Sequence, residues 1–115
     1  MIKRIQPGQR YSAAVIHGNV AYLAGIVADD DSQDVVGQTR QVLQSIDALL
    51  ATLGTDKRGI LKAEIFLHDI ARDYDGMNQA WEEWMDKDHL PARATVQAAL
   101  STPEELVEIV ITAAV

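Results

Sequence analysis

Cysteine is absent from this chain of 115 residues. Disulfide bonds, thiol nucleophiles and cysteine-ligated zinc are therefore excluded. Lysine and arginine are also scarce, because ten of them face 17 aspartates and glutamates, which gives a formal net charge of −7. Affinity for nucleic acids depends mostly on Lys and Arg. The charge balance therefore argues against a nucleic-acid partner.

Long apolar runs are missing as well. No run approaches the ~20 residues of a membrane-spanning helix, and the first ten residues, MIKRIQPGQR, lack the apolar centre of a secretory signal. We therefore expect a cytoplasmic protein without a membrane partner. Apolar residues make up 48% of the chain, which is enough for one hydrophobic core at this length, and we expect a single domain over residues 1–115.

Several catalytic motifs are absent too. The sequence contains no G-x-G-x-x-G, no Walker A loop, no G-x-S-x-G and no H-E-x-x-H. The three histidines, His17, His68 and His89, have no partner at a metal-ligand spacing, and we assign them surface or structural roles. The three aspartates at 29–31 precede a predicted helix, where capping and solubility explain them better than a calcium loop. We expect no metal site.

The spacing of apolar residues predicts strands alternating with two helices. An order of β-β-β-α-β-α-β-β favours a two-layer α+β architecture, with both helices on one face of a mixed sheet. Because strands 20–27 and 107–115 carry apolar residues on both sides, the other face would remain exposed, and we infer an oligomer that buries it. The strands are expected at 2–5, 11–17, 20–27, 60–68, 93–100 and 107–115, and the helices at 35–53 and 73–86.

The second predicted helix carries aromatic side chains at helical spacing. We interpret Tyr74, Trp81 and Trp84 as core residues rather than as a cofactor site. Asn78 lies on the same face of this helix, and an amide beside Trp81 needs a hydrogen-bond partner. A cap or a backbone hydrogen bond is one explanation of Asn78, and a role in a site is the other.

The segment from Leu90 to Val115 organises the rest of the prediction. It contains two apolar strands joined by the polar turn 101–105, and each strand carries one charge, Arg93 or Glu108. Burying a charge is costly unless the charge is paired. The pair is therefore either a structural ion pair or edge-strand charges, or a carboxylate-binding arginine with a glutamate that holds or activates water.

Strand geometry limits how these two charges can meet. A simple hairpin centred near Pro103 would place Arg93 opposite Ala113 and Glu108 opposite Ala98. The two charges would then lie five residues, or ~17 Å, apart along the sheet. If the strands are not neighbours, the charges are displaced sideways as well. We therefore expect Arg93 and Glu108 to meet only between subunits of an oligomer.

The chain resembles the reactive intermediate deaminase family, also called the Rid or YjgF family, over essentially its whole length. The C-terminal half is most similar to the YoaB-type bacterial branch. The motifs that carry the resemblance are Pro91-Ala92-Arg93-Ala94-Thr95-Val96-Gln97, Val107-Glu108-Ile109, Tyr11 ahead of the turn His17-Gly18-Asn19, Ala24-Gly25, Gln38-Thr39-Arg40 and Met77-Asn78.

This resemblance implies a chorismate-mutase-like α+β fold and a homotrimer with three clefts between subunits. It also implies hydrolysis of enamine and imine intermediates, such as 2-aminoacrylate and 2-iminobutanoate, to 2-oxo acids and ammonia without a cofactor. By the family pattern, Arg93 would hold the substrate carboxylate and Glu108 would position and deprotonate the attacking water. The remaining substrate-binding residues would be Tyr11, Ala24, Gly25, Asn78 and Thr95.

Two positions depart from the family pattern. Many active members have Ser where this chain has Ala24, and many have Cys where it has Thr95. The loss of the Ser hydroxyl keeps a second hypothesis open, namely a non-catalytic trimer that binds small carboxylates, or regulates a partner, through the same clefts. A third and weaker hypothesis is the RNA-cleaving or chaperone-like activity of some relatives, against which the net charge of −7 speaks.

Overall fold

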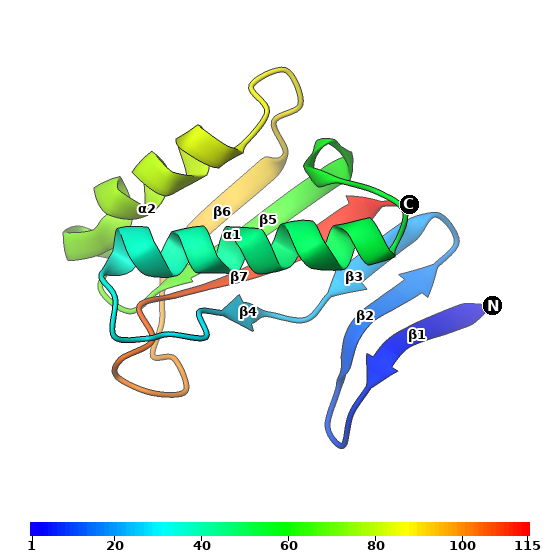
Figure 1. Cartoon of the computed structure of the whole chain (residues 1–115), viewed down its shortest axis with the longest axis horizontal. Helices are drawn as coiled ribbons and strands as arrows, with labels where there is room; N and C mark the ends of the chain where they lie inside the picture. The colour runs from blue at the N-terminus through cyan, green and yellow to red at the C-terminus, as the bar shows by residue number, and fades with distance from the viewer.

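The computed structural model describes residues 1–115 as seven strands, two α-helices and one 3₁₀ turn (Figure 1). The strands are β1 (Ile2–Pro7), β2 (Ser12–His17), β3 (Val20–Leu23), β4 (Ile26–Val27), β5 (Ile60–Leu67), β6 (Ala92–Gln97) and β7 (Val107–Ala114). The helices are α1 (Val35–Thr52) and α2 (Ile70–Trp84), and the 3₁₀ turn is η1 (Lys57–Gly59).

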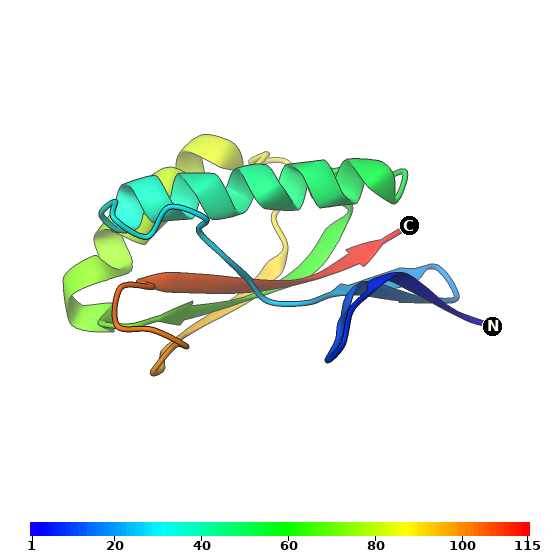
Figure 2. The same ribbon diagram turned by 60° about the horizontal axis from the view of Figure 1, so that its bottom comes forward.

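All seven strands join one mixed sheet. The order is β1-β2-β3-β7-β5-β6, and β4 pairs with β7 further along the same edge as β3. Only β5 and β6 are parallel to each other. Both helices pack on one side of the sheet, and the opposite side has no helix (Figure 2). The predicted two-layer α+β architecture is therefore confirmed.

The core lies between the helices and the covered face of the sheet. Residues at every second position of β7 are fully buried, as the alternation in the sequence predicted. The buried side of α1 recurs at steps of three and four residues, which places one stripe of the helix against the sheet. The core side chains of these two elements are Val107, Ile109, Ile111, Ala113, Val42, Leu43, Ile46 and Leu50.

The loop before α1 differs from the prediction in its capping residue. The cap of α1 is Asp34, whose side chain accepts a hydrogen bond from the Gly37 N–H. Asp30 instead accepts hydrogen bonds from the hydroxyl and the backbone N–H of Ser32, which lower the pKa of its carboxyl. The aspartates at 29–31 were predicted to cap this helix, and that prediction is wrong, because the capping residue is Asp34.

The ends of both helices also differ from the predicted ones. Helix α2 begins at Ile70 rather than at residue 73, because Asp69 caps it by accepting from the Arg72 N–H. The Gln97 side chain accepts from the Ile70 N–H at the same end. Helix α2 stops at Trp84, two residues before the predicted end, and α1 stops at Thr52, one residue before it.

The predicted strand 20–27 is two strands. The break falls at Ala24-Gly25, where the Ala24 N–H donates to the Ala13 carbonyl instead of pairing with β7. Expected burial on both faces is also wrong for the single chain, since the Tyr22 side chain is 51% exposed. At the N-terminus, β1 includes Gln6 and Pro7, two residues beyond the expected end at residue 5, and Gln6 adopts a positive φ of 48°.

The two C-terminal strands do not form a hairpin. Strand β5 lies between them, parallel to β6 and antiparallel to β7. The connection 98–106 is long enough to cross the end of β5, where the His68 N–H donates to the Leu106 carbonyl and the Ala98 N–H donates to the Leu67 carbonyl. The predicted hairpin is therefore wrong. The structure contains the alternative, in which the two strands are not neighbours and Arg93 and Glu108 are displaced sideways from each other.

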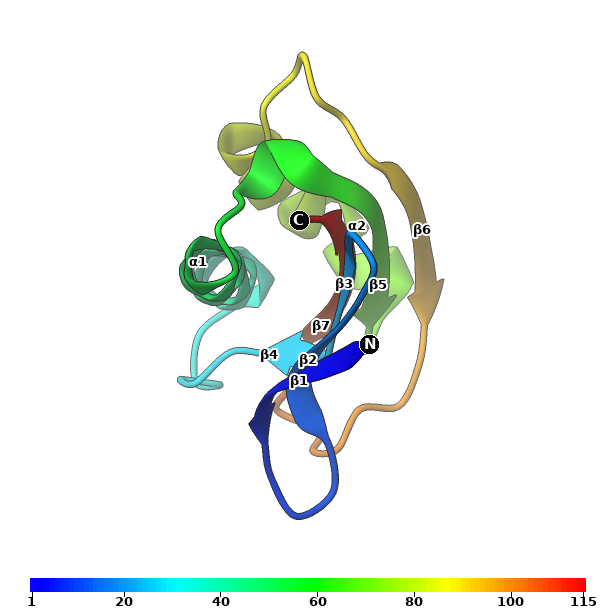
Figure 3. The same cartoon turned by 90° about the vertical axis from the view of Figure 1, so that its right-hand side faces the viewer.

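The face without helices carries many apolar side chains. Cross-strand partners place Val15 beside Tyr22, and Phe66 beside Val96, on this open face. The Tyr22 and Val96 side chains are 51% and 48% exposed. Figure 3 shows α1 nearly end-on beside the curved sheet, whose far side is bare. An apolar sheet face of this kind is typical of an association surface.

Candidate functional site

A cleft opens on the chain where β3 gives way to β4. We name it the Glu108 cleft, because the Glu108 side chain enters it from β7. Its volume is about 290 Å³. The cleft brings together four of the site residues expected from the sequence, and its full lining is Tyr11, Ala24, Gly25, Val27, Ser101 and Glu108.

Gly25 and Glu108 are in unusually close contact. A Cβ atom built on Gly25 would lie 2.2 Å from Oε2 of Glu108 and 2.9 Å from its Cδ. Only glycine therefore leaves room for the carboxylate in this position. None of the four ion pairs and none of the side-chain hydrogen bonds within the chain involves Glu108. The cleft thus holds a carboxylate without a protein partner.

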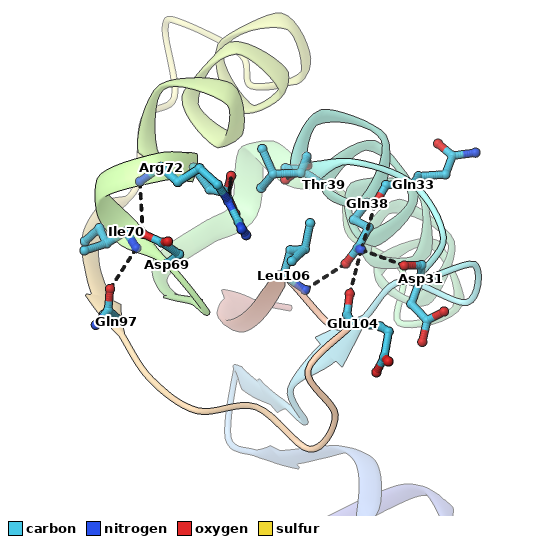
Figure 4. A network of polar contacts seen from close by, with 12 residues as sticks. Asp31, Gln33, Gln38, Thr39, Asp69, Ile70, Arg72, Gln97, Glu104 and Leu106 are labelled. Atoms are coloured by element: carbon cyan, nitrogen blue, oxygen red, sulfur yellow. Dashed lines mark hydrogen bonds and ion pairs between the residues drawn. The ribbon is translucent and has the colours of Figure 1, made fainter.

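The loops around this cleft are fixed by a residue to which the sequence analysis gave no role, Gln38 of α1. Its side chain is fully buried, and its amide nitrogen donates to the backbone carbonyls of Asp31, Gln33 and Glu104. Its amide oxygen accepts from the Leu106 N–H at 2.9 Å, as Figure 4 shows. Because Leu106 stands two residues before Glu108, this network sets the start of β7.

A glutamate in the 98–106 connection orders the other wall of the cleft. The Glu105 carboxylate accepts hydrogen bonds from the backbone N–H groups of Ser101 and Thr102 and from the Ser101 hydroxyl. The Ser101 hydroxyl is therefore engaged within its own loop. The only other hydroxyl in the cleft belongs to Tyr11, whose side chain is 72% exposed.

A second cleft lies on the other half of the molecule, between α2 and β6. We name it the Arg93 cleft, and its volume is about 370 Å³. The Arg93 guanidinium carbon stands 5.4 Å from the centre of the Trp81 ring, and Nη2 is 3.4 Å from the Tyr74 hydroxyl. The cleft is lined by Tyr74, Asn78, Trp81, Glu82, Met85, Lys87, Leu90 and Arg93.

Asn78 and Thr95 are both left with free polar groups on this side of the molecule. The Asn78 side chain lines the Arg93 cleft and makes no hydrogen bond within the chain, so it does not serve as a cap or bind the backbone. Thr95 lies two residues beyond Arg93 on the same face of β6, but it lines neither cleft, and its hydroxyl is the one buried side-chain polar atom without a partner.

The aromatic stripe of α2 is only partly core. Trp81 is buried, with 6% of its surface exposed, whereas Tyr74 is 41% exposed beside Arg93. Trp84 is half-buried and donates from Nε1 to Asp47 of α1 at 2.8 Å. The interpretation as core therefore holds for Trp81 and is wrong for Tyr74.

The turn 86–89 leads from α2 to the Arg93 cleft. The Asp88 N–H donates to the Asp86 carboxylate, and the His89 side chain lies 3.3 Å from it. Both contacts lower the pKa of Asp86, the backbone hydrogen bond having the larger effect. The turn therefore has its own polar contacts ahead of Leu90 and Arg93.

Arg93 and Glu108 lie far apart within the chain. Arg93 pairs with Ala63, which is buried on the helix-covered face, whereas Glu108 lies beside the buried Ile109 and points to the open face. The register places them three residues along the sheet and two strands across, about 14 Å between Cα atoms. The structural ion pair considered from the sequence is therefore absent, while Arg93 does lie on an edge strand.

No group of three or more His, Asp or Glu side chains is placed to bind a metal ion. Neither helix is long and apolar enough to cross a membrane. The chemistry available in the two clefts is that of one guanidinium, one carboxylate, aromatic surfaces and a few neutral polar groups.

The sequence matches a family model described as Endoribonuclease L-PSP over residues 1–115. Three relatives are similar along most of their length. A RutC family protein from Haemophilus ducreyi is 47% identical over 115 residues, covering 100% of this chain and 97% of that protein. The RutC family protein YoaB from Escherichia coli K12 is 45% identical, covering 99% and 98%. A 3-aminoacrylate deaminase RutC from Acinetobacter baylyi is 36% identical, covering 86% and 82%.

Solved structures have the same fold. NMB1025 from Neisseria meningitidis, a member of the YjgF protein family, superimposes with a TM-score of 0.95 at 40% identity, covering 99% of this chain and 94% of that one. A putative translation initiation inhibitor from Salmonella typhimurium gives 0.90 at 43% identity, covering 99% and 97%. The α+β fold of the chorismate-mutase-like type, expected from the sequence, is thus confirmed.

Proposed function

Since the chain belongs to the Rid/YjgF family, whose model carries the description Endoribonuclease L-PSP, with YoaB-type proteins among its relatives, we propose that it is an imine deaminase. It hydrolyses small 2-imino acids, of the 2-aminoacrylate and 2-iminobutanoate type, to 2-oxo acids and ammonia. The relative from Acinetobacter baylyi named as a 3-aminoacrylate deaminase supports a deaminase role. Residues 1–115 act as one functional unit, and the reaction needs no cofactor.

The proposed active site lies between subunits of a homotrimer. The Glu108 cleft and the Arg93 cleft open on opposite faces and different halves of the sheet, so one chain holds two incomplete sites. A head-to-tail ring closes when the Arg93 cleft of each subunit meets the Glu108 cleft of the next. Such a ring also covers part of the open face, whose Tyr22 and Val96 side chains are about half exposed.

Arg93 binds the substrate carboxylate in this site. A guanidinium presents two parallel N–H groups to a carboxylate, which fixes both the position and the plane of the bound acid. The Trp81 ring and the Tyr74 hydroxyl hold the guanidinium in place before substrate arrives. Asn78 offers a free amide in the same cleft, for the carboxylate or for the imine nitrogen.

Glu108 supplies the base. Its carboxylate accepts a proton from a water molecule as the water oxygen bonds to the imine carbon, and the C=N double bond becomes a single bond. That proton passes from Glu108 to the nitrogen, which gives a carbinolamine with a hydroxyl and an amino group on one carbon. Glu108 then takes the hydroxyl proton and returns it to the amino group, the C–N bond breaks, and ammonia leaves as the C=O bond forms. An imine carbon is already electrophilic, so orientation and one base supply much of the acceleration.

One observation carries this proposal, namely the unpaired Glu108 carboxylate held against Gly25 in an open cleft. A structural glutamate on a half-buried strand would be expected to have an ion-pair or hydrogen-bond partner. Glu108 has none within the chain, and its carboxyl group occupies the space that a side chain at residue 25 would fill. A carboxylate kept free in this way is available to a water molecule or a ligand.

Hydrolysis of freshly generated 2-iminobutanoate tests the proposal. An amino-acid oxidase would produce the imine, and the release of 2-oxobutanoate and ammonia would be followed with and without this protein. We expect clear acceleration over the spontaneous rate, and a loss of about 10²- to 10⁴-fold in Glu108→Gln. A parent protein without acceleration, or a Glu108→Gln variant as fast as the parent, would exclude the deaminase mechanism.

A second function is favoured by Ala24. Its methyl group stands in the Glu108 cleft where many active members have a hydroxyl, and the Ser101 hydroxyl is already bound to Glu105. The same clefts would then bind small carboxylates without turning them over, or regulate a partner. Calorimetric binding of 2-oxobutanoate without any imine turnover would favour this function.

The family description also names a ribonuclease. Three of the ten lysines and arginines, Arg40, Arg58 and Arg72, are paired with carboxylates, and the net charge is −7. RNA binding needs unpaired cations along the phosphate backbone. We therefore do not favour RNA cleavage for this chain.

A further inference from the structure

The strand that pairs with Glu108 on the side of its cleft is very short. Strand β4 contains only Ile26 and Val27, which pair with Ile109 and Glu108 of β7. Val27 also lines the Glu108 cleft. The ladder that holds this wall of the cleft against β7 therefore ends at Glu108 itself. A pair of two-residue segments is too short to fix the position of a side chain on its own.

The Gln38 side chain continues the contact beyond the end of this ladder. Its amide nitrogen donates to two backbone carbonyls in the loop after β4 and to one in the connection before β7, and its amide oxygen accepts from an N–H of that connection. Figure 4 shows these partners, which are in that order Asp31, Gln33, Glu104 and Leu106, at 3.2, 3.0, 2.9 and 2.9 Å. A buried polar network in which every member has a partner holds its segments rigidly.

The other wall of the cleft is attached to the same amide. Ser101 lines the cleft, and the Glu105 carboxylate accepts from its N–H and its hydroxyl. Glu105 stands between the two residues of the connection that bind the Gln38 amide. Val27 on one side and Ser101 on the other are thus both tied to Gln38 through short backbone segments. The Gln38 amide therefore sets how the two walls stand around Glu108.

Gln41, one helical turn further along α1, binds the same loop without reaching β7. Its amide oxygen accepts from the Asp30 N–H at 2.9 Å, and its amide nitrogen donates to the Asp30 carbonyl at 3.0 Å. Neither bond extends to the connection 98–106. The loop after β4 therefore has a support of its own, and what Gln38 adds is the link from this loop to the start of β7.

We propose that Gln38 is a positioning residue, which fixes the Glu108 carboxylate relative to the walls of its cleft for the attack of water on the substrate. This inference rests on the proposed function, because it takes Glu108 as the base. A base must lie within hydrogen-bond reach of the proton that it accepts, and a displacement of about 1 Å can cost about 10²-fold in rate. Gln38 does not line the cleft, so it acts only through Glu108 and the surrounding backbone.

Steady-state kinetics of Gln38→Met with 2-iminobutanoate test this inference on the intact protein. We expect kcat to fall by about 10- to 100-fold, since the base is no longer held in place. KM should stay within about twofold of the parent value, because Arg93, which binds the substrate carboxylate, lies on β6 and shares no partner with Gln38. Thermal unfolding sets a temperature at which the variant is folded. Gln38→Asn, whose amide is one methylene shorter, repeats the test if Gln38→Met does not fold.

Gln41→Met is the matched control. It removes two hydrogen bonds to the backbone of the same loop and none to the connection before β7. Because the link between the loop and Glu108 remains, we expect its kcat to stay within about twofold of the parent value. A loss that reflects only a loosened loop would lower kcat in both variants alike.

The carboxyl resonance of Glu108 gives a second measurement that needs no turnover. Glutamate labelled with ¹³C at the side-chain carboxyl would be incorporated, and the Glu108 signal would be assigned by its absence in Glu108→Gln. We expect this signal to shift in Gln38→Met and to stay in place in Gln41→Met, because only the first exchange changes how the cleft walls surround the carboxylate.

The outcomes separate this inference from the proposed function. A Gln38→Met protein with the kcat of the parent, or an equal loss in Gln41→Met, would overturn the positioning role and leave the deaminase proposal standing. An unmoved Glu108 resonance in Gln38→Met would also overturn it. A parent protein without turnover would exclude the deaminase mechanism, whereas a resonance that shifts only in Gln38→Met would still support Gln38 as the residue that fixes this carboxylate.

Discussion

The Arg93 cleft and the Glu108 cleft are organised in opposite ways. In the Arg93 cleft the charged group is surrounded by side chains of its own chain, since Trp81 lies under the guanidinium and Tyr74 contacts its edge. In the Glu108 cleft the charged group has no partner, and its place is defined by the missing side chain of Gly25. Side-chain contacts define the Arg93 cleft, and the absence of a side chain at Gly25 defines the Glu108 cleft.

This difference shows how one chain can prepare two halves of a site that it cannot complete. A cation loses little by resting on an aromatic ring, and it keeps its N–H groups free for a carboxylate. A base that is to act on water must not be neutralised by a partner in its own chain. The roughly 14 Å between the Cα atoms of Arg93 and Glu108, and their opposite faces, keep the two from pairing.

Mixing two inactive variants is the strongest test of this division. Arg93→Ala and Glu108→Gln are each expected to lose about 10²- to 10⁴-fold in kcat/KM for 2-iminobutanoate. In randomly mixed oligomers, about a quarter of the sites would combine an intact Arg93 from one subunit with an intact Glu108 from the next. Imine hydrolysis should therefore recover to about a quarter of the parent rate.

The control for that experiment is a mixture of Glu108→Gln with the double variant Arg93→Ala, Glu108→Gln, which contains no intact Glu108 and should stay inactive. Native mass spectrometry would confirm that subunits have exchanged. Fully exchanged oligomers without recovered activity would mean that the two clefts do not form a shared site.

Gly25→Ala tests the empty position in the Glu108 cleft. The new Cβ would fall 2.2 Å from Oε2 of Glu108, so the carboxylate must move. A displacement of about 1 Å at a catalytic group can cost about 10²-fold, and we expect kcat/KM to fall by about 10- to 100-fold. Gly8→Ala is the control, since its Cβ would meet only the Tyr11 carbonyl at 3.4 Å. Equal rates for the two variants would contradict the steric role of Gly25.

Gln38→Met tests the support beneath the same cleft. The exchange keeps the size of the side chain and leaves the Leu106 N–H and three backbone carbonyls without their partner. We expect the free energy of unfolding to fall by about 2–4 kcal/mol. Urea unfolding at one protein concentration would measure it. Gln44→Met, on the exposed side of α1, should change it by less than about 0.5 kcal/mol. An unfolding curve of Gln38→Met like that of the parent would show that the network contributes little.

Tyr74→Phe is the mildest test, and it concerns the Arg93 cleft. The hydrogen bond from Arg93 to the Tyr74 hydroxyl is long, at 3.4 Å, and Trp81 remains under the guanidinium. We expect KM for the 2-imino acid to rise by about two- to threefold with kcat unchanged. Tyr22→Phe, whose hydroxyl makes no hydrogen bond within the chain, provides the comparison. A large loss of kcat in Tyr74→Phe would mean that the hydroxyl acts on the reacting atoms.

The sequence predicted the fold well wherever the buried face of a helix or strand could be read from its own residues. The alternation of apolar residues in β7 and the three- and four-residue spacing in α1 survived in the structure, because each reflects one buried face. The errors occurred where segments far apart in the sequence compete to pair with the same strand. The hairpin of the last two strands failed because β5 inserts between β6 and β7, and the long third strand failed because Ala24 pairs with Ala13 instead of β7.

Candidate site residues were found in part from the sequence. Tyr11, Ala24, Gly25 and Glu108 do line one cleft, and Asn78 and Arg93 line the other. The sequence analysis noted Gln38 only within the motif Gln38-Thr39-Arg40. Its structural role was not predicted, because its partners are backbone groups at residues 31, 33, 104 and 106, far apart in the sequence. The role of Tyr74 was misread, since helical spacing does not show which aromatic residue borders a cleft.

By itself, the sequence determined the helix-covered core, the family, and the presence of one arginine and one glutamate on apolar strands. Those features follow from local periodicity and residue type, which act over a few neighbours. Only the tertiary structure decided that Arg93 and Glu108 face opposite sides of the sheet and that Gly25 makes room for the carboxylate. These depend on strand order and register, which are set by the packing of the whole sheet against its two helices.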